Sequence, residues 1–292
     1  MKDFEVWPGP MEGVGRGGFI TAVNHLKLVP QWMTPFFRIS RDIPRHSKMR
    51  EFLAPFQSGG VPVCVQLMGT DPVLLGKCAE IFAGMNISSI NLNFGCPSSR
   101  VISSGAGGGA LRNFHQLPDF CRTVKSFMPP ELPLSVKVRS GWESAGDMEV
   151  FLPALSQCPE VSKIFFHYRT VKEQYREIAA EERLHRFVRA VELAGNVPLI
   201  VNGDIASVDE AGEIVEKSRA CGVMIARPWM RDPWLLRRFT DRDLPDAGSG
   251  RELFFAEAVR QQIPKGGLIE LALMLWGRDS AHFRELIAGK SD

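Results

Sequence analysis

The chain has 292 residues, of which 45% are hydrophobic and 23% are charged. These values are ordinary for a globular protein and exclude wholesale disorder, a collagen-like repeat and a disulfide miniprotein. Lys plus Arg number 35 and Asp plus Glu number 33, which gives a formal net charge of +2. A charge so near neutral excludes a histone-like polycation, although it permits a local basic patch.

No apolar run reaches the roughly 18 residues of a membrane-spanning helix, so we expect no membrane association. The first ten residues lack the basic start and apolar stretch of a signal peptide. The six cysteines are too far apart for a zinc or iron–sulfur motif, and no metal site is evident. They are Cys64, Cys78, Cys96, Cys121, Cys158 and Cys221. Such scattered cysteines predict reduced thiols in a cytoplasmic protein, with all except Cys96 serving as packing residues.

Short apolar runs alternate with longer amphipathic segments along most of the chain. The runs are rich in β-branched or aromatic residues and are bounded by Gly, Pro or polar residues, which predicts parallel strands buried on both faces. In chain order, we expect strands at residues 5–10, 34–40, 61–67, 89–94, 134–138, 163–167, 198–202 and 222–226.

Helical patterns separate several of these strands, at residues 71–82, 117–128, 148–157, 180–194 and 207–218. The first begins with Asp71 as N-cap and Pro72 at the first helical position, and the last has the capping-box spacing of Ser207 and Glu210. Eight β/α units predict an α/β fold, a (β/α)8 TIM barrel, over residues 1–240. Residues 241–251 are polar and helical patterns follow at 252–262 and 268–276, which predicts a short C-terminal helical domain over residues 241–292.

The predicted strands end in polar residues that an apolar strand has no packing reason to keep. Active sites of such barrels lie at the carboxyl ends of the strands. If the eight ends share one register, these side chains surround one opening, which favours a functional site over a structural one. They are Gln66, Asn93, Cys96, Lys137, His167, Asn202 and Arg227.

Each of these residues also has a simpler interpretation. Gln66 would cap a strand end, His167 would be a core histidine with its hydrogen bonds satisfied, and Arg227 would be a surface arginine. Cys96 would be a small buried hydrophobe, although the flanking Gly95 and Pro97 place it on a turn where a thiol can meet substrate. Lys137 shares a strand face with Ser135 and Arg139, and an ammonium inside a barrel is too costly without an anion or a polar partner.

Three further segments carry possible ligand-binding features. Gly203 and Ala226-Arg227 follow the seventh and eighth strands, where barrels often bind phosphate. The glycine-rich run 105–110 lacks the context of a dinucleotide-binding motif, and we expect an active-site loop there. Residues 38–50 contain five Lys or Arg against Asp42 alone, which indicates either a solvated loop or a phosphate-contacting segment. A second, weaker basic concentration lies at residues 237–251.

Six segments together resemble those of one enzyme family, in its order and with roughly its spacing. They are residues 10–14, 65–69, 91–98, 135–139, 167–170 and 201–205. The block Asn93-Phe94-Gly95-Cys96-Pro97 with a glycine-rich run after it is the most specific element. Residues 5–240 resemble the tRNA-dihydrouridine synthases, in particular the bacterial branch that includes the synthase for uridine 16. The chain departs from the family pattern at Gly9, Pro35 and Pro228, and its C-terminal region is shorter.

The resemblance implies an FMN-dependent barrel followed by a tRNA-binding helical domain. In that family NADPH reduces the flavin, hydride passes from flavin N5 to C6 of a uridine in tRNA, and a cysteine protonates C5 to give 5,6-dihydrouridine. Cys96 matches the cysteine, while Asn93, Arg139 and Arg169 match substrate-binding positions. The tRNA is the only expected partner of a monomer. The implied cofactor site consists of Pro10, Met11, Gln66, Lys137, His167, Asn202, Gly203, Asp204, Ala226 and Arg227.

Two alternatives stay open from the sequence. One is a flavoenzyme that acts on a free pyrimidine, like dihydroorotate and dihydropyrimidine dehydrogenases, which share a barrel and a loop cysteine. The other is a decayed, non-catalytic RNA-binding barrel. The basic segment 38–50 and the helical appendage favour RNA as substrate, and the presence of Cys96, Lys137 and His167 together favours catalysis.

Overall fold

The computed structural model describes residues 4–10, 17–241 and 243–288, so the expected cofactor residue Met11 lies outside the described residues. The strands are β1 (Glu5–Pro8), β2 (Trp32–Met33), β3 (Phe37–Arg38), β4 (Val63–Met68), β5 (Ser89–Phe94), β6 (Leu134–Arg139), β7 (Val161–His167), β8 (Leu199–Asn202) and β9 (Gly222–Ile225).

Helices follow most of the strands. The α-helices are α1 (Gly17–His25), α2 (His46–Gln57), α3 (Pro72–Ala83), α4 (Ser99–Ile102), α5 (Leu117–Lys125), α6 (Met148–Ser156), α7 (Ala180–Ala194), α8 (Val208–Ser218), α9 (Arg227–Arg231), α10 (Ala247–Arg260), α11 (Lys265–Trp276) and α12 (Ala281–Ile287). Three 3-10 helices are η1 (Gly107–Gln116), η2 (Ala145–Asp147) and η3 (Arg237–Phe239).

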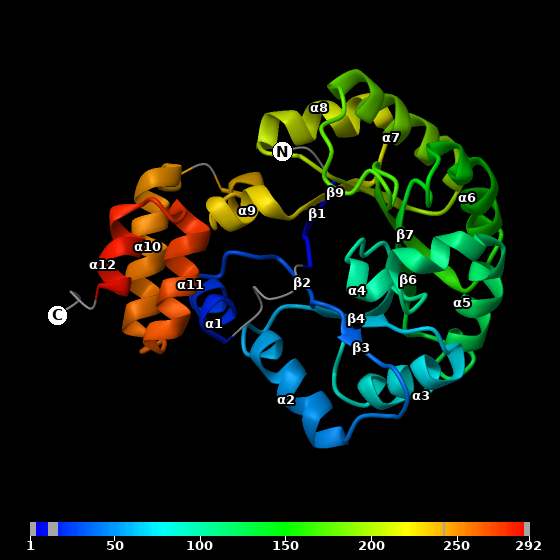
Figure 1. Ribbon diagram of the computed structural model, residues 1–292, viewed down its shortest axis with the longest axis horizontal. Coiled ribbons are helices and arrows are strands. Elements are labelled where there is room, and N and C mark those ends of the chain that lie inside the picture. Colours follow the sequence, from blue (N-terminus) through cyan, green and yellow to red (C-terminus); the bar gives the residue numbers. More distant parts are fainter. Residues whose placement is uncertain (1–3, 11–16, 242, 289–292) are drawn as a thin grey trace.

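The strands form one parallel sheet that curls into a barrel. Their order is β1-β9-β8-β7-β6-β5-β4-β2, with β3 also paired to β4. At the seam between β1 and β2, the Gln31 side chain donates a hydrogen bond to the Val6 carbonyl at 3.3 Å. Figure 1 shows α2, α3 and α5–α8 in a ring outside the strands. The predicted TIM barrel is therefore confirmed.

Strand alternation divides the side chains into an outer shell and a barrel interior. Outward residues such as Val65, Leu92 and Val136 pack against the surrounding helices in the main core. The lower interior is a separate apolar cluster, made of Trp7, Met33, Cys64, Phe165, Ile200 and Met224. The barrel is therefore closed by side chains below, and the residues above this cluster face the carboxyl ends of the strands.

The second predicted strand, residues 34–40, is wrong in its extent. The structure has two short strands there, β2 and β3, separated by Thr34 and Pro35. The Thr34 hydroxyl accepts a hydrogen bond from the Gln66 backbone N–H at 3.0 Å, and Pro35 has no N–H to donate to the ladder. The chain therefore leaves the ladder and rejoins it at Phe37.

Helix starts follow their capping residues. Asp71 accepts hydrogen bonds from the N–H groups of Val73 and Leu74 at 2.9 and 3.1 Å, and Ser207 accepts one from Glu210 at 3.1 Å, so both predicted caps are confirmed. Helix α10 begins before the predicted residue 252. Its N-cap Asp246 accepts hydrogen bonds from Gly248 and Ser249 at 2.7 and 3.0 Å, which outweighs the low helix propensity of that polar stretch.

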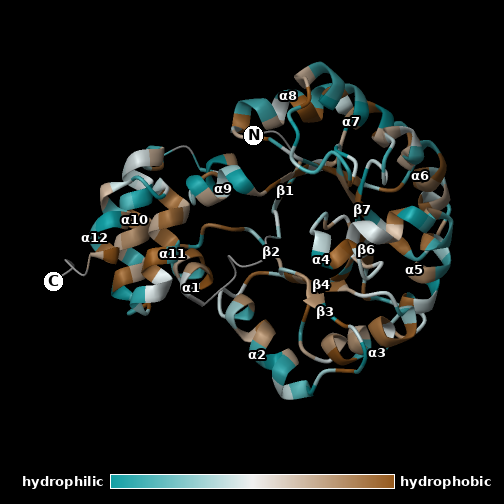
Figure 2. Ribbon diagram, in the orientation of Figure 1, coloured by the Kyte–Doolittle hydropathy of each residue, from teal (hydrophilic) through white to brown (hydrophobic). Residues whose placement is uncertain are grey.

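The last three helices pack together beside the barrel, next to α1 and α9 (Figure 1). Figure 2 shows that α10 and α11 are strongly hydrophobic where they lie together. The buried Glu257 of α10 is 2.6 Å from Nδ1 of His25 in α1, which ties these helices to the barrel. The sequence patterns did not include α12, which begins after the N-cap Ser280. In the part of the chain that the structure describes, no helix has both the length and the apolarity to cross a membrane.

Candidate active site

A cavity of about 680 Å³ opens at the carboxyl ends of the strands. Eleven of the residues proposed from the sequence line it, namely Pro10, Asn93, Cys96, Lys137, Arg139, His167, Asn202, Gly203, Asp204, Ala226 and Arg227. Gln66 and Arg169 are buried close by but do not line it. The prediction that the strand ends surround one opening is thus confirmed for most of these residues.

Sheet register explains why these side chains meet. Asn93 pairs with Lys137, Arg139 with His167, and His167 with Asn202 across neighbouring strands. Paired residues of parallel strands lie at one level and on the same face of the sheet. Alternation then points all of them into the barrel, where Lys137 pairs with Phe165 and Asn202 with Met224 of the apolar cluster.

Cys96 lies on a turn that is fixed from two sides. The Asn93 carboxamide oxygen accepts hydrogen bonds from the backbone N–H groups of Gly95 and Cys96, both at 3.0 Å. On the other side, the Gly108 N–H donates to the Cys96 carbonyl at 2.9 Å. A Cβ at Gly108 would lie 2.9 Å from that carbonyl oxygen and 2.8 Å from Val171, so only glycine permits this approach.

The glycine-rich run after Cys96 is not the expected loop. Gly107, Gly108 and Gly109 are buried and begin the 3-10 helix η1. Glycine is needed there for close packing against the Cys96 turn.

The sequence pattern also predicted Cys221 as a packing residue. This prediction is wrong, because the Cys221 side chain is exposed.

Lys137 places an ammonium group in the cavity, where burial and a neighbouring cation disfavour its charged form. Burial and the nearby Arg139 lower the pKa of its ammonium to about 7, while Cys96 acts in the opposite direction. Among the described residues, none forms a hydrogen bond with this ammonium. A buried lysine in this situation gains most from an anionic or electron-rich ligand.

His167 is held in one tautomer. Its Nδ1 accepts a hydrogen bond from the Arg169 backbone N–H at 3.2 Å, so a neutral ring carries its proton on Nε2. Burial lowers its pKa well below the usual value, and the cations of Arg139 and Lys137 lower it further. His167 therefore offers a neutral N–H donor, and the cavity has a positive potential.

Asp204 organises the side of the cavity formed by β8 and β9. Its carboxylate accepts hydrogen bonds from the Tyr168 hydroxyl at 2.8 Å, from Arg169 and from Arg227. Burial acts against ionisation, but the hydrogen bonds from Arg169 and Tyr168 dominate and lower the pKa of Asp204 to about 2. Gly203 precedes it with φ +125°, and a Cβ there would lie 2.6 Å from the Tyr168 ring.

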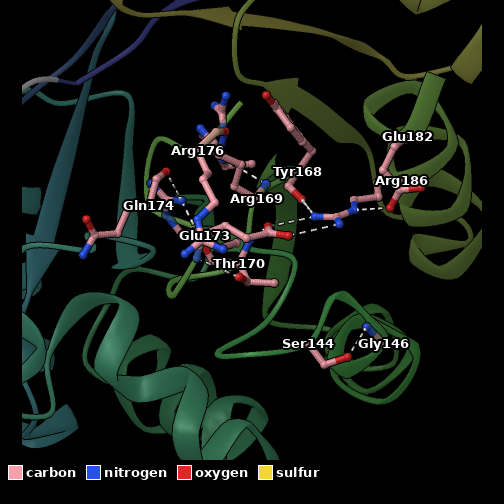
Figure 3. A network of polar contacts seen from close by, with 12 residues as sticks. Ser144, Gly146, Tyr168, Arg169, Thr170, Glu173, Gln174, Arg176, Glu182 and Arg186 are labelled. Atoms are coloured by element: carbon pink, nitrogen blue, oxygen red, sulfur yellow. Dashed lines mark hydrogen bonds and ion pairs between the residues drawn. The ribbon is translucent and has the colours of Figure 1, made fainter. Parts of the chain in front are cut away.

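The loop after β7 is held at its base by an arginine from a neighbouring helix. Arg186 of α7 donates to the Tyr168 carbonyl at 3.1 Å and to the Glu173 carboxylate at 2.9 and 3.1 Å. Figure 3 shows Arg186 between Glu173 and Glu182. Two buried arginines of the barrel hold the tip of the same loop.

These two arginines bind the backbone carbonyl groups on either side of Tyr175. Arg139 donates to the Gln174 carbonyl at 3.1 Å, and Arg169 donates to the Arg176 carbonyl at 2.6 Å. The side chain of Tyr175 is 61% exposed and lines the cavity. Its ring lies 5.1 Å from the Arg227 guanidinium carbon and 6.0 Å from that of Arg139. The sequence analysis missed Tyr175, whose one signal is an aromatic residue inside a polar loop.

The basic segment 38–50 lies on the same side of the barrel. Its five cations, Arg38, Arg41, Arg45, Lys48 and Arg50, are exposed, and the helix α2 begins within it at His46. Arg38 donates a hydrogen bond at 3.2 Å to the Ser104 hydroxyl, in the segment that follows Cys96. The segment thus continues from the rim of the cavity onto the surface.

Comparison with solved structures identifies the same fold. Histamine dehydrogenase from Rhizobium sp. 4-9 superposes with a TM-score of 0.62 at 12% identity, covering 87% of this chain and 48% of that chain. The crystal structure of TcOYE with pHBA gives a TM-score of 0.60 at 9% identity, covering 82% of this chain and 89% of that chain. At these identities the likeness concerns the barrel alone.

Sequence comparison is more specific. A protein of Rickettsia conorii named "Probable tRNA-dihydrouridine synthase" is 35% identical over 175 residues, 59% of this chain and 50% of its own length. The "tRNA-dihydrouridine(16) synthase" of Vibrio parahaemolyticus is 29% identical over 227 residues, 75% of this chain and 68% of its own length. The chain spans about half the length of the Rickettsia relatives. Residues 8–265 match the family described as "Dihydrouridine synthase (Dus)", so the chain belongs to the dihydrouridine synthase family.

Proposed function

We propose that this protein reduces a uridine in tRNA to 5,6-dihydrouridine, using FMN as cofactor and NADPH as reductant. The observation that carries the proposal is the convergence of Cys96, Lys137 and His167 on one cavity in a chain of this family. The names of the Rickettsia and Vibrio relatives give the same substrate class.

The residues of the cavity fit FMN. Its volume is in the usual range for cofactor pockets, about 300–1,000 Å³. Burial lowers the pKa values of Lys137 and His167 most, and neighbouring cations lower them further. The cations favour a ligand with a phosphate and an electron-accepting ring in this cavity. Bound there, FMN would supply the hydride for C6 of the base.

We assign the cofactor contacts by position in the cavity. Lys137 and His167 would bind the ring, with Lys137 stabilising negative charge and His167 donating from Nε2. Gln66 contributes from below through Asn93, and Pro10 lies at the first strand end. The phosphate end would be held by Asn202, Gly203, Asp204, Ala226 and Arg227.

Cys96 would deliver the proton to C5 of the base. A thiol held on a rigid turn can meet one face of a base that lies in the cavity. We propose that Asn93 serves substrate reduction by fixing this turn, and that Arg139 and Arg169 serve it by fixing the loop that carries Tyr175. Tyr175 would stack on the base or on its neighbour.

The surface around the cavity favours RNA over a free pyrimidine. A stacked base must be extruded before it can enter the cavity, so the enzyme must hold the surrounding backbone. The exposed cations of residues 38–50 suit phosphate groups, and α10–α12 extend the surface beside the barrel. We therefore propose that residues 241–292 act as a tRNA-binding appendage of a monomer.

The test is dihydrouridine formation measured by mass spectrometry. Protein, FMN and NADPH are incubated with unmodified tRNA and, separately, with uridine nucleotides, uracil and orotate. We expect product only in tRNA, and nuclease mapping then gives the position. Product only from a free base would assign the protein to pyrimidine metabolism. Failure of a folded sample to bind flavin would support a non-catalytic RNA-binding barrel.

A further inference from the structure

A chain of buried hydrogen bonds crosses the barrel interior below the Cys96 turn. The Asn91 amide donates to the Ser135 hydroxyl at 2.9 Å, and its oxygen accepts from the Gln66 amide at 2.8 Å. The Gln66 oxygen in turn accepts from the Asn93 amide at 2.7 Å. The Asn93 oxygen accepts from the N–H groups of Gly95 and Cys96. Four side chains on three strands thus connect the barrel interior to the backbone of Cys96.

The donor-to-acceptor direction of these hydrogen bonds is fixed at the end of the series that contacts the Cys96 turn. Two backbone N–H groups face Asn93, so its oxygen must point toward Cys96 and its amide toward Gln66. The Gln66 amide must then donate away from Asn93, to Asn91 and also to the Met33 sulfur at 3.4 Å. One reversed carboxamide would place donor against donor at the next contact.

The end of the series at Ser135 favours the same donor-to-acceptor direction. The Ser135 hydroxyl donates to the Ile90 carbonyl at 3.2 Å, which leaves its oxygen free to accept from Asn91. The Asn91 side chain is fully buried, and the row of residues below it includes Cys64 of the apolar cluster. A polar group at this depth costs free energy unless each hydrogen bond is made, and an apolar residue would fill the space without that cost.

We propose that Asn91 is a positioning residue for the proton donor Cys96. Asn91 holds Gln66 in the one orientation that lets Asn93 fix the Cys96 turn. Asn91 does not line the cavity, and its side chain connects to the Cys96 turn through Gln66 and Asn93. The inference rests on the proposed function insofar as Cys96 is the proton donor, whereas the control of the turn by Asn91 is independent of the reaction.

The substitution Asn91→Leu tests this inference against Asn91→Asp as its matched control. Leucine cannot accept a hydrogen bond from the Gln66 amide, so Gln66 loses the contact that fixes its orientation. Aspartate still accepts from Gln66, and the Ser135 hydroxyl can rotate to donate to it, which keeps the polarity above. Ser135→Ala, paired with Ser135→Thr, provides a second, smaller perturbation of the same chain if Asn91→Leu fails to fold.

The first readout is alkylation of Cys96 by iodoacetamide in flavin-free protein, mapped by mass spectrometry, with the exposed Cys221 as internal reference. We expect Asn91→Leu to change the Cys96 to Cys221 rate ratio at least about fivefold and Asn91→Asp to leave it within about twofold, in line with the sensitivity of reactive groups to small displacements. If Asn91→Leu folds and keeps the wild-type ratio, or if Asn91→Asp changes it equally, the inference is wrong. For the second pair, Ser135→Ala should shift the ratio and Ser135→Thr should not.

The second readout separates this inference from the proposed function. In the holoenzyme, Asn91→Leu should lower kcat for dihydrouridine formation about tenfold or more, with little change in KM for tRNA. This loss should exceed any loss in the rate of flavin reduction by NADPH, to which Gln66 also contributes. No product from wild-type protein would refute the proposed function and leave the alkylation result standing. Product from Asn91→Leu at the wild-type rate would refute the role of Asn91.

Discussion

Cys96 is the residue on which the proposed chemistry depends most directly. We expect Cys96→Ala to keep FMN binding and the rate of flavin reduction by NADPH, because the cavity and its cations are unchanged. Dihydrouridine formation should fall about 10²-fold or more, the usual contribution of a positioned general acid. Cys221→Ala, which removes an exposed thiol, is the control and should be neutral. Wild-type turnover of tRNA by Cys96→Ala would refute the assignment.

Lys137 illustrates a conflict between stability and function within one side chain. Its pKa is about 7 in the folded protein against the ordinary value of 10.5, so between these pH values the unfolded state binds more protons. The cost of Lys137 to stability is therefore full below pH 7 and disappears as the pH rises toward 10.5. Charge is kept in the cavity at the expense of folding free energy.

Lys137→Met should therefore stabilise the flavin-free protein at neutral pH. We expect Tm to rise by about 2–4 °C or more at pH 7, which corresponds to at least about 1 kcal/mol for a chain of this size. The gain should shrink at pH 9.5, where the wild-type lysine has less cost. The same variant should bind FMN more weakly at pH 7 in a fluorescence titration. Equal Tm values with unchanged FMN affinity would contradict the role of Lys137.

At the scale of elements, hydrogen bonds from three arginine side chains fix the conformation of the loop after β7. Arg139, Arg169 and Arg186 donate to four carbonyl groups and one carboxylate of this loop and its base, so Tyr175 is presented on an ordered backbone. A preorganised aromatic ring loses little entropy when a base stacks on it.

The variants Tyr175→Ala and Tyr175→Phe measure this contribution. Stacking on an aromatic side chain is worth about 1–3 kcal/mol per base, so Tyr175→Ala should lower kcat/KM for tRNA about tenfold or more. Tyr175→Phe keeps the ring and should stay within about threefold of wild type. Flavin reduction by NADPH should be unaffected in both. Equal losses in the two variants would assign the role to the hydroxyl group instead.

The boundaries of helices and strands show where local sequence signals are sufficient to predict the structure. The caps Asp71 and Ser207 begin α3 and α8 as their sequence context predicts, because the bonds that define them are made within four residues. The break between β2 and β3 depends on the contact of Thr34 with Gln66, 32 residues away. The start of α10 depends on Asp246, which lies within a stretch that resembles a loop in composition.

At the scale of the whole molecule, charge placement predicts how RNA binds. The net charge is only +2, so affinity for RNA must come from where the cations lie. Residues 38–50 begin at the end of β3 and therefore lie at the rim of the cavity. Lys217 is in the last turn of α8 and Arg219 follows that helix, before β9, so both lie at the opposite end of the barrel.

This asymmetry can be tested with two double variants of equal charge. Arg41→Gln with Arg45→Gln should weaken tRNA binding and reduce the slope of log Kd against log salt by about 1.4, because each lost phosphate contact contributes about 0.7 for flexible single strands. Lys217→Gln with Arg219→Gln should leave affinity and slope unchanged. Fluorescence anisotropy with labelled tRNA gives both quantities. Equal effects of the two pairs would show that only net charge matters.

The sequence by itself determined the repeated β/α pattern, the barrel, and the polar residues at the strand ends. These follow from periods of two and 3.6 residues and from capping contacts, which are local properties of the chain. Once the strands are parallel and in register, Asn93, Lys137, His167 and Asn202 must lie around one opening.

The tertiary structure alone decided how these residues are held. Arg139 reaches the Gly95 carbonyl 44 positions away, and the Asn91 amide reaches Ser135 across the same distance in sequence. Such contacts depend on the closure and curvature of the barrel, which no local pattern encodes. The sequence predicted Arg139 and Arg169 as substrate contacts, and the structure adds that they hold the loop that presents Tyr175.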